Sequence, residues 1–350
     1  MYYCSDTVLQ SIRYGKSAPY LAAIRRFAPL ESVRIGSHPV RILISGSGGL
    51  IGSALVPVLT GAGHDVVRLV RRFGPSSGTS DAIGWDPERR EIARDALEGV
   101  DSVVHLAGEP ILGRWTGAKK QRIAESRTIG TSLVAEALAT LRRRPTVLVC
   151  ASGAGYYGDR GDELLTEDSK RGVGFLADLC RDWEAAADPA RRAGIRVVHL
   201  RTGLVLSRIG GLLKSMLLPF RLGLGGPIGR GRQYWSWIAL EDLVTAYVFA
   251  LEHEDLFGGV NATAPNPVTN AEFTRTLGGV LNRPAVLPVP PFALRLLFGR
   301  EATDEAMLSG ARVIPARLVE CGYRFRYPEL EPALRQALGP QEVPAQESSE

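Results

Sequence analysis

A glycine-rich turn between a short apolar strand and an apolar helix constrains this chain more than any other stretch. The β-branched run Val40–Ile44 predicts a buried strand, and an apolar helical pattern runs from Leu50 to Leu59. Between them a glycine recurs at every third position: Gly46, Gly49 and Gly52. The first glycine permits a sharp turn, the second lets the backbone approach a pyrophosphate, and the third lets the helix lie close on the sheet. Because the N–H groups at the helix start then face the anion, the stretch predicts a dinucleotide-binding crossover.

Strands and helices alternate after this turn. Further strands are predicted at 64–70, 82–85, 102–106, 146–151 and 196–201. Helices are predicted at about 118–141, 175–192 and 241–252. The alternation predicts an α/β fold with a Rossmann-type doubly wound parallel sheet rather than a barrel, because only one glycine-rich turn opens it.

The composition shifts toward glycine, leucine and proline after residue 210, which predicts a smaller mixed C-terminal domain on the substrate side. Thr269-Asn-Ala-Glu272 is a capping box that opens a helix ending near Leu281. Alternation in Tyr323–Tyr327 favours an edge strand, and the aromatic cluster Gln233–Trp237 is either a substrate lid or part of the core. We divide the chain into an N-terminal extension (1–39), a Rossmann domain (40–268), a small C-terminal domain (269–338) and a disordered tail (339–350).

Composition excludes several classes of function. The apolar content of 45 % and charged content of 23 % are ordinary for a globular protein. Of the net charge of +5, residues 1–41 carry +4, so no basic face for nucleic acid is visible on the rest. No apolar run reaches the ~18 residues of a membrane span. The four cysteines are scattered and no histidine cluster accompanies them, which argues against disulfides and a metal site.

We therefore expect a cytoplasmic protein with buried free thiols and no metal, nucleic-acid or membrane partner. A homodimer stays open. We interpret residues 1–39 as a poorly ordered extension or the remnant of a lost upstream domain. Because they are rich in arginine and serine and poor in acids, an organelle presequence is the alternative.

The end of the second strand indicates which cofactor binds. An acid at this point hydrogen-bonds the ribose of NAD, whereas an arginine accommodates the 2′-phosphate of NADP. The chain has Arg71 and Arg72 here and no acid. A charge-assisted hydrogen bond contributes about 1.5–3 kcal/mol, or about ten- to a hundredfold in affinity. We therefore favour NADP(H) over NAD(H); the alternative is that both arginines face solvent.

Small residues end the next two strands. His105-Leu-Ala-Gly108 leaves room for a ligand beyond its strand, and His105, among apolar neighbours, is interpreted as a core histidine. Ser152 ends a central strand, and a glycine-loosened loop with Tyr156 and Tyr157 follows it. This serine and these tyrosines are the candidate catalytic residues.

These features resemble the extended, epimerase-type branch of the short-chain dehydrogenase/reductases. More closely, residues 40 to about 338 resemble an atypical subgroup described as NAD-dependent epimerase/dehydratase family proteins. The motifs that carry this resemblance are Arg114-Trp-Thr116, Ser126-Arg127, Gly155-Tyr-Tyr-Gly158, the run Pro219–Pro227, Ser236-Trp-Ile238 and Asn261-Ala-Thr-Ala-Pro265. Members end in a small domain of unknown function, which residues 269–338 match, including Pro315–Leu318.

The resemblance implies that Arg71, Leu106, Ala107, Arg127 and the segment near Leu204 contact NADP(H). The full set of candidate cofactor-binding residues is Gly46, Ser47, Gly49, Leu50, Ile51, Gly52, Arg71, Arg72, Leu106, Ala107, Gly108, Arg122, Arg127 and Leu204.

One departure from the short-chain dehydrogenase pattern leaves the function open. These enzymes carry a Tyr-xxx-Lys pair on the helix after the fifth strand, in which the lysine lowers the pKa of the tyrosine. Here that helix reads Phe175-Leu-Ala-Asp-Leu179, and no tyrosine of the chain has a lysine four residues later.

Two functions remain. The first is an NADP(H)-dependent oxidoreductase or epimerase on a small molecule, in which Tyr156 or Tyr157 gives the proton and Ser152 holds the reacting oxygen. The second is a catalytically silent NADP(H)-sensing regulatory protein. A methyltransferase interpretation of the turn is disfavoured by the second-strand arginines.

Overall fold

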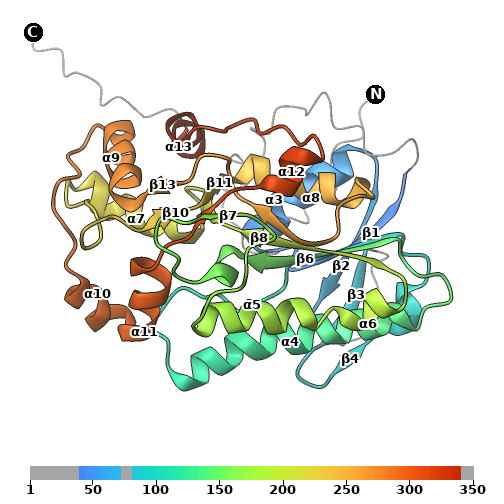
Figure 1. Ribbon diagram of the computed structural model, residues 1–350. Coiled ribbons are helices and arrows are strands. Elements are labelled where there is room, and N and C mark those ends of the chain that lie inside the picture. Colours follow the sequence, from blue (N-terminus) through green and yellow to red (C-terminus); the bar gives the residue numbers. More distant parts are fainter. Residues whose placement is uncertain (1–38, 72–80, 340–350) are drawn as a thin grey trace, which may run out of the picture. The chain divides into compact units, whose positions relative to one another are not determined.

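An eight-stranded sheet forms the centre of the protein (Figure 1). The computed structural model describes residues 39–71 and 81–339. The strand order is β12-β8-β6-β5-β1-β2-β3-β4, and every pair is parallel except β3–β4. The strands are β1 Arg41–Ser45, β2 Asp65–Val70, β3 Ala82–Asp86, β4 Glu91–Ile92, β5 Ser102–His105, β6 Val147–Gly153, β8 Arg196–Thr202 and β12 Gly258–Ala262. The predicted Rossmann-type class is confirmed.

Helices cover both faces of this sheet. Figure 1 shows α4, α5 and α6 together on one face and α3 and α8 on the other. Their bounds are α3 Leu50–Gly61, α4 Gly117–Ala139, α5 Phe175–Ala185, α6 Asp188–Arg192 and α8 Leu240–Glu252. Two 3₁₀ turns, η1 Arg94–Leu97 and η2 Ala154–Tyr157, complete this part. The large core lies between the sheet and α4, where each buried Leu, Val or Ile contributes about 1.5–3 kcal/mol.

A second set of elements forms its own core. It contains three pairs of short strands, each strand two or three residues long. They are β7 Leu164–Leu165 with β14 Arg312–Val313, β9 Leu204–Leu206 with β11 Trp237–Ala239, and β10 Tyr234–Trp235 with β13 Val268–Thr269. The helices are α7 Gly211–Arg221, α9 Asn270–Leu281, α10 Pro291–Phe298, α11 Arg300–Thr303, the π-helical turn Asp304–Leu308 (η3), α12 Ala316–Glu320 and α13 Leu330–Leu338.

The structure decides the role of the paired tryptophans. Trp235 and Trp237 are both buried in the core that α7, α9 and α13 share. Trp235 packs edge-on against Phe273, and the indole of Trp237 donates to the backbone oxygen of Asn266 at 3.1 Å. Of the two interpretations left open by the sequence, core packing is the one that the structure shows.

Most predicted boundaries hold within two residues, and the exceptions have local causes. The capping box is confirmed, since the Thr269 hydroxyl accepts from the backbone N–H of Glu272. The helix predicted over 175–192 is instead two helices, α5 and α6. Pro189 lies in the first turn of α6, where its missing N–H needs no partner, so the long helix breaks just before it.

The prediction of an edge strand at Tyr323–Tyr327 is wrong. This segment is irregular, because the buried carboxylate of Asp242 takes its backbone donors. The N–H groups of Arg326 and Tyr327 donate to that carboxylate at 2.7 and 2.9 Å. A side chain thus replaces the neighbouring strand that the alternation had implied.

Several predictions fall partly or wholly outside the described residues: the N-terminal extension, Arg72, Cys4 and the tail. Cys150 and Cys180 are buried free thiols, and Cys321 is a half-buried one. In the described part of the chain no helix is long and apolar enough to cross a membrane.

His105 is a core histidine, as predicted. It is fully buried at the end of β5, and its Nδ1 lies 2.7 Å from the hydroxyl of Ser45 on the neighbouring strand. His199 on β8 is also buried. Burial lowers the pKa of both imidazoles from 6.5 to about 4, because neither charged form is solvated there.

These two histidines predict acid sensitivity. Below about pH 6.5 the unfolded chain protonates both, while the folded protein protonates neither until about pH 4. The unfolding free energy should therefore be highest above pH 6.5 and should decrease as the pH falls toward 4, by roughly 3 kcal/mol per histidine. Urea unfolding at pH 7 and pH 4.5 measures this loss. His105→Gln should make the decline shallower, and an unchanged decline would remove His105 from the explanation.

Candidate functional site

The glycines of the turn after β1 allow neighbouring backbone segments to approach one another closely. Gly46 has φ +65°, and a Cβ on it would lie 2.8 Å from the Ala107 nitrogen. A Cβ on Gly52 would lie 2.4 Å from the Gly46 oxygen, so neither position accepts a side chain. At Gly49 the nearest contact of such a Cβ is the Gly46 oxygen at 3.3 Å. Gly49 is also the N-cap of α3, so no capping side chain covers the first N–H groups, and the turn fits a pyrophosphate.

Ser45 fixes the neighbouring strand end against this turn. Its hydroxyl accepts from the N–H groups of Leu106 at 3.0 Å and Ala107 at 3.2 Å. The ends of β1 and β5 are thereby held at the distance that the turn requires. The sequence predicted no site role for Ser45, because its register with His105 on the neighbouring parallel strand becomes visible only in the fold.

The remaining apolar candidates gather at the same edge. Leu50, at the start of α3, packs against Gly210 and Gly211, which lead into α7. Leu204 lies on β9, where its N–H donates to the Ser236 oxygen at 2.7 Å. The structure therefore brings the 46–52 turn, the 106–108 strand end and the 204–211 segment to one edge of the sheet. Ser47, Ile51 and Gly108 lie within these segments.

Three cations surround one carboxylate beside the turn. Glu109 pairs with Lys119 at 2.7 Å and lies 3.8 Å from Arg122. The hydrogen bond from Lys119, followed by the charges of Lys119, Arg122 and Arg71, lowers the pKa of Glu109. Arg71 is exposed directly after β2. One acid does not neutralise three cations, so a surplus of positive charge remains where a 2′-phosphate was expected.

Arg127 bonds to the backbone of the loop that follows β5. Its side chain is buried, its Nη1 donates to the backbone oxygens of Glu109 and Ile123, and its guanidinium stacks on Trp183. Burial lowers its pKa to about 10. Arg127 thus shapes the Gly108–Glu109 backbone, and the direct cofactor contact that the resemblance implied stays a prediction.

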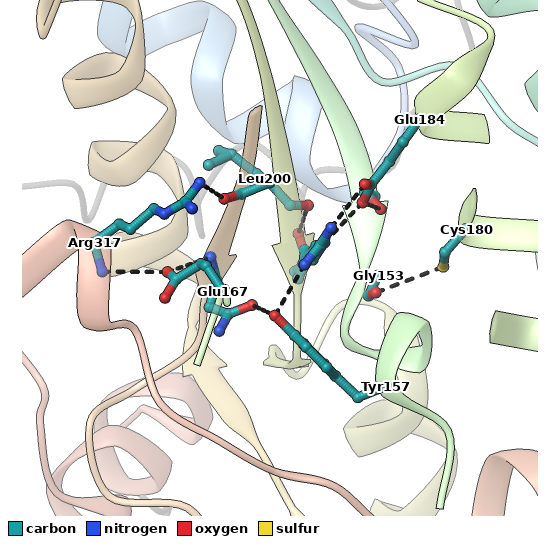
Figure 2. A network of polar contacts seen from close by, with 12 residues as sticks. Gly153, Tyr157, Glu167, Cys180, Glu184, Leu200 and Arg317 are labelled. Atoms are coloured by element: carbon teal, nitrogen blue, oxygen red, sulfur yellow. Dashed lines mark hydrogen bonds and ion pairs between the residues drawn. The ribbon is translucent and has the colours of Figure 1, made fainter. Parts of the chain in front are cut away.

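A buried guanidinium connects the candidate catalytic residues. Arg201 of β8 is 5 % exposed and makes two bonds to the carboxylate of Glu184 on α5, at 2.8 and 2.9 Å. The hydroxyl of Ser152 donates to the same carboxylate at 2.8 Å. Arg201 also donates to the Tyr157 hydroxyl at 3.0 Å. We call Ser152, Tyr157, Glu184, Arg201 and Asn261 the Arg201 network; Figure 2 labels Glu184 and Tyr157, the two side chains to which the guanidinium donates.

Tyr157 is a fully buried member of this network. Its hydroxyl donates to the side-chain oxygen of Asn261 at 2.7 Å. Burial is the main cause that raises its pKa, against the opposing effect of Arg201. Ser152 is buried as well. For either side chain to act on a substrate, its hydroxyl must first leave its present partner.

Tyr156 differs from both. It is half-buried, and the Arg201 guanidinium lies 3.4 Å from the centre of its ring. Its ring packs edge-on against Tyr157 at 5.2 Å. A fixed cation under the ring therefore sets the orientation of the one candidate tyrosine that reaches the surface.

Residues from the C-terminal part extend this arrangement. The backbone N–H of Asn261 donates to the buried Glu167 carboxylate at 2.9 Å, and the N–H of Arg317 reaches the same oxygen (Figure 2). Glu305 accepts from the first N–H groups of α5, at Phe175 and Leu176, both at 3.0 Å. These contacts span about 100 residues or more of sequence, so no local pattern predicted them.

The helix that bears the Tyr-xxx-Lys pair in related enzymes begins here with an aromatic residue that contacts a tryptophan and a lysine. Phe175 packs edge-on against Trp115 at 5.1 Å, and the Lys120 ammonium lies 5.0 Å from the Phe175 ring. In the described residues, no group of three His, Cys, Asp or Glu is placed to hold a metal ion.

Two family models match the chain. The model of the NAD dependent epimerase/dehydratase family matches residues 42–261, and a domain of unknown function (DUF1731) matches residues 289–337. Among curated proteins, an epimerase family protein of Mycobacterium bovis, Mb2239, is 46 % identical over 84 % of this chain and 96 % of its own. Human epimerase family protein SDR39U1 is 40 % identical, covering 85 % of this chain and 99 % of its own.

Solved structures give the same picture. Human SDR39U1, determined with NADPH, superimposes with a TM-score of 0.77 at 38 % identity and covers 85 % of this chain and 99 % of that one. A nucleoside-diphosphate sugar epimerase of Corynebacterium glutamicum gives a TM-score of 0.72 at 36 % identity, covering 92 % of this chain and 62 % of that one.

The buried pair in the Arg201 network predicts a large loss of stability on Glu184→Gln. This change keeps the shape but leaves a desolvated guanidinium without its counter-charge, so the unfolding free energy should fall by about 3–5 kcal/mol. Asp178→Asn is the control on the same helix, since Asp178 pairs with Arg171 and Arg181 while half-exposed, and should cost under about 1 kcal/mol. Equal losses in urea unfolding would contradict the importance of the buried pair.

Proposed function

This chain belongs to the NAD dependent epimerase/dehydratase family, and from that membership and the site geometry we propose that it is an NADP(H)-dependent oxidoreductase or epimerase acting on a small molecule. The observation that carries the proposal is the tyrosine fixed over a buried cation at the carboxyl end of β6, on the same edge of the parallel sheet as the turn that fits a pyrophosphate. Support for the cofactor comes from the human relative solved with NADPH.

In this proposal the pyrophosphate lies on the 46–52 turn, and the 2′-phosphate lies by Arg71 and Arg122. The backbone of Leu106–Gly108, shaped by Arg127, and the segment at Leu204 border the rest of the dinucleotide. When bound, its nicotinamide supplies or accepts a hydride. Arg72 stays a candidate for the 2′-phosphate on the basis of its position in the sequence alone.

Tyr156 is the residue that moves the proton. In the reducing direction its hydroxyl gives a proton to the substrate oxygen as the new C–H bond forms, and the phenolate then regains a proton from water. In the oxidising direction the phenolate takes the proton back. Arg201 lies against the face of the Tyr156 ring and fixes its orientation, and the two bonds to Glu184 prevent the guanidinium from moving.

Ser152 and Tyr157 help to fix the position of Tyr156. Ser152 holds Glu184, and Tyr157 packs against the Tyr156 ring while bonding Arg201. Direct binding of the reacting oxygen by Ser152 remains the alternative for this side chain.

The second candidate function is NADP(H) sensing without turnover. The start of α5 favours it, because Phe175-Leu-Ala-Asp-Leu179 contains neither the tyrosine nor the lysine of the usual pair, and Lys120 beside Phe175 is bonded to Glu301. Under this alternative the cofactor binds and its redox state is transmitted to a partner.

Cofactor choice tests the assignment of Arg71. Arg71→Ala should weaken NADPH binding about ten- to a hundredfold and leave NADH binding nearly unchanged, because only NADPH carries the 2′-phosphate. Isothermal titration calorimetry with both cofactors measures the difference. Arg68→Ala is the matched control, an exposed arginine on the same strand but away from its carboxyl end. Equal losses for NADPH and NADH would refute the assignment.

Turnover separates the two functions. The protein is mixed with NADPH and a panel of carbonyl compounds, and absorbance of the reduced nicotinamide is followed. Nucleotide sugars are incubated with the protein and NADP⁺ and analysed by NMR for the epimer, because epimerisation causes no net change in the cofactor. Tyr156→Phe should lower turnover about a hundredfold or more, the range typical of a lost acid–base group, while NADPH binding is retained.

Tyr157→Phe is the comparison, and it should reduce stability more than turnover. Loss of activity in Tyr157→Phe with full activity in Tyr156→Phe would assign the proton to the other tyrosine. Tight NADPH binding with no turnover across the panel would favour the sensor.

A further inference from the structure

Helix α10 presents apolar side chains to solvent. None of its residues is buried, and Phe292, Leu296 and Leu297 are 73 %, 76 % and 65 % exposed. A helix of this kind normally turns its apolar side inward. Contiguous exposed apolar surface marks an interaction site.

The apolar surface continues from α10 onto the end of α7. The segment that leads into α10 runs beside residues 221–229: the Val289 N–H donates to Pro227 and its oxygen accepts from Gly229. Along these two segments Leu222, Leu224 and Val286 are exposed. Figure 1 shows α7 and α10 on the side of the fold away from β3 and β4. We call Leu222, Leu224, Val286, Phe292, Leu296 and Leu297 the apolar surface.

The segments that carry this surface are rich in positive charge, most of which is not paired with an acid. Residues 208–232 and 273–300 contain nine arginines or lysines and no aspartate or glutamate. Seven of the nine are exposed and form no ion pair with any described residue: Arg208, Lys214, Arg221, Arg230, Arg232, Arg275 and Arg283. The other two, Arg295 and Arg300, pair with Asp304. The net charge of the whole chain conceals this concentration, because acids elsewhere balance it.

We propose that the apolar surface and its basic surroundings dock on an anionic lipid membrane, with α10 lying in the interface. Leucine and phenylalanine side chains enter the boundary between headgroups and acyl chains, while arginines meet lipid phosphates. This revises the expectation that no membrane is a partner, which was drawn from the lack of a spanning run. A surface-lying helix needs no such run.

Charge disfavours the other occupants. In a twofold dimer the same surface would face itself, which would place like charges against one another. An acidic protein would satisfy the arginines, but protein interfaces are enriched in aromatic anchors, whereas five of the six apolar residues are leucine or valine. An anionic lipid surface satisfies both components. The inference is independent of the proposed hydride transfer.

Co-sedimentation with vesicles tests it. The full chain should bind vesicles of phosphatidylcholine with phosphatidylglycerol, bind weakly to phosphatidylcholine alone, and dissociate as salt is raised. Leu296→Glu/Leu297→Glu and Arg221→Glu/Arg283→Glu should each weaken binding about tenfold or more. Both double variants should keep their melting temperature and NADPH affinity, which shows that they are folded.

Arg94→Glu/Arg192→Glu is the charge-matched control, with two exposed arginines outside the surface. It should weaken vesicle binding by less than about threefold, because its charges lie away from the bound lipid. No dependence on phosphatidylglycerol would overturn the proposal, as would equal effects of the control and surface variants. A dimer in solution that Leu296→Glu/Leu297→Glu dissociates would assign the surface to a second copy. Binding to polyglutamate but not to vesicles would assign it to an acidic protein.

Discussion

A guanidinium that is buried beside a β-sheet must be neutralised where it lies, and that requirement organises the centre of this protein. Arg201 has lost its water, so Glu184 on α5 has to stay within hydrogen-bond distance of it. This fixes α5 against β8, and Ser152 and Tyr157 fill the remaining positions around the pair. The same cation also lies against the ring of Tyr156. Fold stability and the orientation of the candidate acid thus depend on one ion pair.

Local signals predicted the parts of the site that the backbone builds. Gly52 is required by a clash with the Gly46 oxygen inside the seven-residue turn, and Gly46 by its φ of +65° and by the Leu106–Ala107 backbone beside it. The glycine spacing and the position of Arg71 after β2 are both readable in the sequence. The Arg201 network is different. Its five members come from five separate elements, and nothing near Tyr156 or Tyr157 indicates which of them is buried.

Other expectations required knowledge of tertiary partners. The alternation at Tyr323–Tyr327 resembled a strand until Asp242, more than 80 residues earlier, supplied its hydrogen bonds. Trp235 and Trp237 suited a lid as well as a core until Phe273 packed against Trp235 and the Trp237 indole bonded to the backbone of Asn266. In each case a long-range contact, absent from any local window, decided between conformations that the sequence allowed equally.

The carboxylate of Glu305 caps a helix that begins 130 residues before it. During synthesis the chain emerges from its N-terminus, so α5 leaves the ribosome long before the group that satisfies its first amides. The Rossmann-like part therefore completes this helix only after those 130 residues have been made. A shortened chain that lacks Glu305 would expose the helix end together with its neighbouring aromatic stack. Truncation of the C-terminal part is accordingly a poor route to an isolated nucleotide-binding module.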